Sequence, residues 1–89
     1  MKTKKITLQM FSDPGHGWVR FPKKRLVKLG IADQISTYSY QNGENAFLDE
    51  DCDLSVLCDA LTRNGYEITF KSGFTNRRSK IRNFDYYKA

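Results

Sequence analysis

The stretch STYSYQNGENAFL, residues 36–48, decides the fold because it predicts a β-hairpin in the middle of the chain. Residues 36–41 and 44–48 flank the dipeptide Asn42-Gly43. Asn-Gly is the strongest short-range hairpin pattern, since both central residues of a type I′ turn need a positive φ. We therefore expect two antiparallel strands joined at Asn42-Gly43.

The residues before the hairpin predict two more strands and a short helix. Apolar and polar residues alternate over residues 4–11, as in a strand with one buried face. A turn cluster at residues 12–17 separates this strand from a second one at residues 18–21. A helix over residues 22–29 follows, because proline is tolerated in a first helical turn and Gly30 suits a left-handed C-terminal cap.

The residues after the hairpin predict a second helix and a last strand. Four side chains at helical spacing share one apolar face, namely Leu54, Leu57, Cys58 and Leu61. Asn64-Gly65 ends this helix, and alternation over residues 66–71 indicates a strand. The order β-β-α-β-β-α-β predicts a single α+β domain with a mainly antiparallel sheet. We assign its core to residues 1–71 and expect residues 72–89 to form a basic, aromatic arm or docked tail of the same domain.

Length and composition indicate one small globular domain with no membrane partner. A chain of 89 residues holds one core, and its 39% hydrophobic content does not fit a disordered chain. No apolar run approaches the roughly 18 residues that cross a bilayer, and the N-terminus lacks the apolar region of a signal peptide. We therefore expect a cytoplasmic protein. Its two cysteines, Cys52 and Cys58, should stay reduced, because on a helix they lie too far apart for a disulfide.

One short stretch, Asp13-Pro14-Gly15-His16-Gly17, resembles the first zinc-binding motif of the cell-wall amidases, in which the histidine binds the metal. A catalytic zinc ion needs about three protein ligands. Those enzymes add a second histidine and a glutamate from far along the chain, whereas this sequence has a single histidine. We therefore expect no metal and no other cofactor, and we place His16 at the exposed tip of a tight turn.

A run of acids lies between the hairpin and the second helix. Residues 44–59 contain six acids and no Lys or Arg, so the rest of the chain carries fifteen bases against four acids. The run does not fit an EF-hand calcium loop, because Leu54 and Ala60 occupy positions that require glycine and glutamate. Acids at the start of a helix cap free N–H groups, but four exceed what one cap needs. We expect the excess to form an acidic protein-contact patch, with the candidates Asp49, Glu50, Asp51 and Asp53.

The sequence contains no recognisable catalytic constellation. A nucleophilic cysteine or serine needs a base within hydrogen-bond reach, and His16 is the one ordinary candidate. Cys58 lies on the apolar helix face, and Cys52 lies beside acids that disfavour a thiolate. We therefore expect a binding protein and not an enzyme.

Basic residues gather in two places. Five basic residues lie among four aromatic residues between residues 71 and 87. This combination suits contact with phosphates and stacking on nucleobases. A second basic cluster surrounds the start of the first helix. The candidate contacts to nucleic acid or to another partner are Arg20, Lys23, Lys24, Arg25, Arg77, Arg78, Lys80 and Arg82.

Part of the chain resembles a family of DNA-binding proteins. Residues 18–48 are similar to the AbrB-like swapped-hairpin proteins in the order of WVRFPKKRLVKLGI, a Tyr-rich strand and QNGENAFL. That resemblance implies a dimer whose contacts to DNA are Arg20, Lys23, Lys24 and Arg25. The chain departs from that family in the turn after the helix and in the further helix and strand that follow.

Nearly the whole chain is similar to small proteins of tailed phages and prophages, on the stretches SDPGHGW, LGIADQIS, YSYQ, DEDCD and RRSKIR. That resemblance implies an accessory viral protein in the cytoplasm of a bacterial host. Small charged phage proteins often bind and block a host or defence complex, as anti-CRISPR and anti-restriction proteins do, and this step is an analogy. Two functions are therefore expected: docking on a host or defence protein complex, or direct contact with DNA or RNA.

Overall fold

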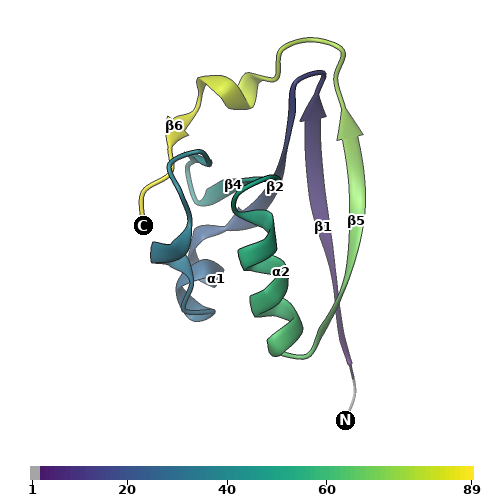
Figure 1. Ribbon diagram of the computed structural model, residues 1–89, viewed down its shortest axis with the longest axis vertical. Helices are drawn as coiled ribbons and strands as arrows, with labels where there is room; N and C mark the ends of the chain where they lie inside the picture. Colours follow the sequence, from purple (N-terminus) through teal and green to yellow (C-terminus); the bar gives the residue numbers. More distant parts are fainter. Residues whose placement is uncertain (1–2) are drawn as a thin grey trace.

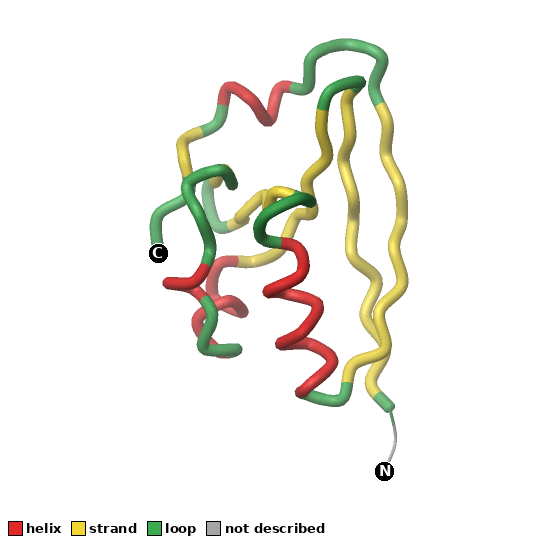
Figure 2. Tube along the Cα trace, in the orientation of Figure 1, coloured by secondary structure: helices red, strands yellow, loops and turns green. Residues whose placement is uncertain are grey.

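The domain is a six-stranded sheet with its helices on one face (Figures 1 and 2). A computed structural model describes residues 3–89. The strands are β1 (Lys4–Asp13), β2 (His16–Pro22), β3 (Tyr40–Asn42), β4 (Asn45–Asp49), β5 (Tyr66–Phe74) and β6 (Asp85–Tyr86). The helices are α1 (Lys23–Lys28) and α2 (Leu54–Arg63), and two 3₁₀ turns, η1 (Ala32–Gln34) and η2 (Lys80–Asn83), complete the elements.

The strand order in the sheet is β5-β1-β2-β4-β3-β6. Four of the five neighbouring pairs are antiparallel, and β1 with β5 is the parallel pair. A parallel pair needs a crossover connection, and α2 supplies it between β4 and β5. The predicted α+β class with a mainly antiparallel sheet is confirmed, while the edge strand β6 was not predicted.

The central hairpin forms, but its first strand is Tyr40–Asn42 instead of the predicted residues 36–41, and its turn lies one residue further along the chain. Asn42 pairs with Asn45, so the central turn residues are Gly43 and Glu44. Gly43 has φ of 60°, and no non-glycine residue within 3–89 has a positive φ. A positive φ at the first central position alone fits a type II′ turn and not the expected type I′ turn. Glycine at position 43 satisfies that turn without help from Asn42.

The first hairpin is longer than its sequence pattern predicted. β1 continues to Asp13 and β2 begins at His16, so that Asp13 pairs with His16 and the tip is Pro14-Gly15. His16 therefore begins a strand and is half-buried, and its predicted place at an exposed turn tip is wrong. Helix α1 ends as expected, with Gly30 at φ 74° and its N–H bonded to the Val27 carbonyl oxygen at 3.0 Å.

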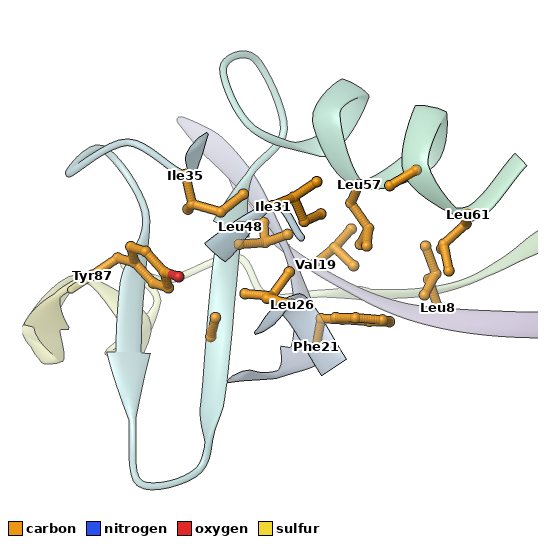
Figure 3. Packing of buried hydrophobic residues seen from close by; sticks show 12 residues of the cluster. Leu8, Val19, Phe21, Leu26, Ile31, Ile35, Leu48, Leu57, Leu61 and Tyr87 are labelled. Atoms are coloured by element: carbon orange, nitrogen blue, oxygen red, sulfur yellow. The ribbon is translucent and has the colours of Figure 1, made fainter. Parts of the chain in front are cut away.

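The main core fills the space between the inner face of the sheet and the two helices (Figure 3). β2 and β4 contribute Val19 and Leu48, and α2 contributes Leu57 and Leu61 from the face that its apolar spacing predicted. All four side chains are fully buried. Within residues 3–89, no helix is long and apolar enough to span a bilayer.

A second, smaller cluster covers part of the outer face of the sheet. Because side chains alternate along a strand, Trp18 and Phe47 point away from the main core, opposite to their neighbours Val19 and Leu48. Ile81 of η2 closes over them. The C-terminal segment thus docks on the sheet and closes around its edge, where the Tyr87 hydroxyl donates to the Ala32 carbonyl oxygen at 2.6 Å.

Asp53 is buried at the start of α2, yet it does not cap that helix with its side chain. Its carboxylate instead accepts hydrogen bonds from the backbone N–H and hydroxyl of Ser36 and from the hydroxyl of Ser39. The expectation that the acidic run caps α2 is therefore wrong here. The Asp53 side chain therefore links the segment before the hairpin to α2, because the serines that donate to it lie seventeen and fourteen residues earlier in the chain.

We expect Asp53→Ala to lower the free energy of unfolding by about 2–4 kcal/mol, because one buried and two partly buried donors lose a charged acceptor. Urea unfolding followed by circular dichroism measures the change. Asp59→Ala on the exposed side of the same helix is the control and should change stability by less than about 0.5 kcal/mol. Equal stability of the two variants would contradict this role of Asp53.

Candidate functional site

Asp13 anchors the C-terminal segment to the first hairpin. Its Oδ1 accepts from the backbone N–H groups of Gly15 and His16, each at 3.0 Å. Its Oδ2 accepts from the Ser79 N–H at 2.9 Å and from Arg82 Nε at 2.7 Å, and Arg82 Nη2 donates to Oδ1 at 2.9 Å. The bonds from Arg82 and Ser79 hold the pKa of Asp13 well below its usual range. The carboxylate is therefore ionised whenever the domain is folded near neutral pH.

A second cluster of titratable groups lies where β2 begins and β4 ends. Asp49 Oδ1 contacts His16 Nε2, while Asp49 Oδ2 accepts from the N–H groups of Asp51 and Cys52 at 3.1 and 2.8 Å. Burial alone would raise the pKa of Asp49, but hydrogen bonds from His16 and Cys52 outweigh it and lower that pKa. Among residues 3–89, the side chains that could together hold a metal ion are those of His16, Asp49 and Asp51.

A hollow of about 190 Å³ opens beside this cluster. Its lining combines titratable groups with aromatic rings: His16, Trp18, Tyr38, Tyr40, Asp49 and Arg82. The Arg82 guanidinium lies 5.2 Å from the centre of the Trp18 ring while it holds Asp13. The Arg82 charge is thus engaged by the protein itself, and the small hollow has both polar and aromatic walls.

The predicted acidic patch is divided by burial. Asp49 and Asp53 are only 4% and 2% exposed and are used inside the domain, as described above. Glu50 and Asp51 remain on the surface. The four acids therefore do not form one continuous surface patch. Cys52 is exposed, and its hydrogen bond to the Asp49 carboxylate raises the pKa of its thiol, consistent with the predicted poor thiolate.

The basic residues near α1 do not share one surface. Arg20 lies on the outer face of the sheet, whereas α1 packs on the inner face. Lys23 Nζ donates to Gln41 Oε1 at 2.8 Å, and the Arg25 guanidinium lies 5.0 Å from the centre of the Phe21 ring. Among the three predicted contacts on α1, Lys24 is the exposed one.

The structure does bring Arg20 together with the C-terminal bases. Two hollows of about 390 and 320 Å³ flank Ser79 and Lys80 and share Phe11 as a wall. Four bases line them, and neither lining contains an Asp or Glu: the bases are Arg20, Arg77, Arg78 and Lys80. Aromatic rings complete the walls, from Phe11, Phe47, Phe74 and Phe84. We call these two adjoining hollows the basic groove.

None of the four groove bases has a carboxylate within 4.0 Å among the residues that the structure describes. Phe74 is 66% exposed. Arg82, predicted with these bases, is committed to Asp13 and lies outside the groove lining. The groove therefore offers unpaired positive charge beside an uncovered ring.

Sequence reasoning missed the partners of Asp13 and His16. The local half of the Asp13 arrangement could have been found, because an aspartate before Pro-Gly commonly accepts from N–H groups two and three residues on. Arg82 lies 69 residues away from Asp13, and Asp49 lies 33 residues away from His16, so no short pattern joins them. Comparison with protein-family models, curated proteins and solved structures finds no match to this chain.

The depressed pKa of Asp13 predicts a pH-dependent contribution to stability. That contribution should be complete above the ordinary aspartate value of 3.8 and should disappear as the pH falls below it, since the folded state holds the ionised form. Asp13→Asn should therefore be much less stable than the parent at about pH 6, and this difference should shrink toward about pH 2. Urea unfolding across this range measures it. Asp59→Asn should keep a constant, small difference from the parent.

Proposed function

We propose that this chain is a non-catalytic binding protein that contacts single-stranded nucleic acid through the basic groove. The observation that carries the proposal is the composition of the groove, which has four basic residues, no acidic residue and four phenylalanine rings in its lining. Lys and Arg contact phosphates without regard to sequence, and aromatic rings stack on unpaired bases. Both interactions are available in one place.

The shape of the groove supports a single strand more than a duplex. Its two hollows of about 390 and 320 Å³ lie on either side of Ser79 and Lys80, and aromatic side chains from the strands and the C-terminal segment line them. An unpaired base can turn into such a hollow, whereas stacked base pairs expose only their edges. Phe74 and Phe11 are the rings best placed for stacking on a nucleobase. The basic side chains of Arg77, Arg78 and Lys80, which follow Phe74 in the chain, would contact the flanking phosphates.

The alternative expected from the sequence is docking on a host or defence protein complex. That role relied on an acidic patch, and the burial of Asp49 and Asp53 leaves only two of its four candidates exposed. Of the eight predicted basic contacts, Lys23, Arg25 and Arg82 are partly buried and make contacts inside the domain. Arg20, Arg77, Arg78 and Lys80 are all exposed and line one groove. The positive surface is therefore the better supported contact.

Salt dependence tests the electrostatic part of this proposal. We expect a fluorescein-labelled single-stranded oligonucleotide to bind the parent protein with log affinity falling linearly against log salt concentration. The triple variant R77A/R78A/K80A should reduce that slope by about 2, because each single-strand phosphate contact contributes roughly 0.7. Fluorescence anisotropy at several KCl concentrations measures both.

The control for this variant removes equal charge elsewhere. K24A/K28A/R63A changes three exposed bases on α1 and α2, away from the groove, and should keep most of the parent slope and affinity. No binding by the parent at low salt, or equal losses in the two triple variants, would overturn the proposal. A duplex of the same sequence, run in parallel, should bind more weakly.

Stacking is tested separately with Phe74→Ala. Loss of one base–aromatic stack should weaken single-strand binding by roughly 5- to 150-fold, equivalent to about 1–3 kcal/mol, and should leave the salt slope unchanged. Phe70→Ala is a matched control, because Phe70 is also exposed on β5 but does not line the groove. Equal affinity of the two variants would exclude stacking on Phe74.

A further inference from the structure

His16, Asp49 and Asp51 converge at one end of the sheet. One ligand-type atom from each side chain lies within 4.8 Å of the other two. The His16 Nε2 atom contacts Asp49 Oδ1, and His16 Nδ1 lies 3.7 Å from Asp51 Oδ2. Each nitrogen of the only imidazole in the chain thus faces a carboxylate.

The fold holds two of these side chains in fixed positions. Trp18 pairs with Asp49, which places the start of β2 beside the end of β4. The His16 ring packs edge-on against Trp18 with 5.2 Å between ring centres. Asp49 Oδ2 is fixed by two backbone N–H groups, so that Oδ1 is directed at the imidazole. Metal-binding carboxylates are typically oriented by outer hydrogen bonds of this kind.

The local charge favours a cation. Asp49 and Asp51 supply two carboxylates and Glu50 lies between them in the chain, while Arg82, the guanidinium in the lining of the adjacent hollow, is neutralised by Asp13. An imidazole with two carboxylates is a ligand set suited to zinc and similar divalent transition metals. The hollow of about 190 Å³ beside His16 leaves room for water in the remaining coordination positions.

We propose that His16, Asp49 and Asp51 bind one divalent transition-metal ion of the zinc class. The bound ion joins the first hairpin to the loop between β4 and α2, since one ligand comes from β2 and two come from the end of β4 and the residues after it. The single histidine in the sequence argued against zinc hydrolysis, and the two carboxylates come to lie beside that histidine only in the folded domain. This site is independent of the nucleic-acid proposal.

Isothermal titration of the chelator-treated protein with ZnCl₂ tests the site. We expect one ion per chain, and we expect Asp51→Asn to weaken binding by at least tenfold. Asp51 is 74% exposed, so this variant should fold normally. Asp59→Asn, which removes an exposed acid from α2, should bind zinc as the parent does. His16→Ala should abolish binding, with circular dichroism as the check of its fold.

Two results would overturn the site. The first is no zinc uptake by the parent, and the second is equal affinity of Asp51→Asn and Asp59→Asn. Because thiolates also bind zinc, Cys52→Ser is measured as well and should retain the parent affinity. Loss of binding in that variant would reject the proposed ligand set. Visible absorption of the Co²⁺-loaded parent, diminished in Asp51→Asn, provides a second reading of the same ligands.

Discussion

The fold depends on a simple constraint, which is that two short helices can cover only one face of a six-stranded sheet. The apolar residues of β2 and β4 that face α1 and α2 form the main core. The opposite face also carries large apolar side chains, Trp18 and Phe47, and they need a cover. The C-terminal segment provides it, and the bonds from Arg82 and Ser79 to Asp13 hold that cover in place. Burial of the ionised Asp13 is tolerated because five donor contacts compensate for lost hydration.

The same constraint creates the basic groove. The C-terminal segment leaves part of the outer face uncovered, and hollows remain on both sides of Ser79 and Lys80. Bases that belong to β2 and to the segment itself line these hollows together. Three acidic residues are buried instead: Asp13, Asp49 and Asp53 each accept several hydrogen bonds inside the domain. The net charge of +5 is therefore expressed on the surface more strongly than the overall composition indicates.

Much of the secondary structure could be predicted because its causes are local. Alternation, helical spacing and the glycines at turns placed both helices and five of the six strands. Errors arose where a distant contact competes with a local preference. Asp53 looks like a helix cap in sequence but bonds to two serines before the hairpin, and Asp49 looks like a surface acid but meets His16. β6 escaped prediction because a two-residue strand has no periodicity and exists only through its pairing with β3.

The sequence by itself determined the α+β class, the central hairpin, the apolar face of α2 and the predominance of positive charge, because these follow from side-chain order and composition. Tertiary structure alone decided which charges reach the surface and which side chains meet. The physical reason is that burial and ion pairing depend on distances between segments far apart in the chain, such as Asp13 with Arg82 and His16 with Asp49. Those distances are fixed only when the sheet is assembled and its outer face is closed.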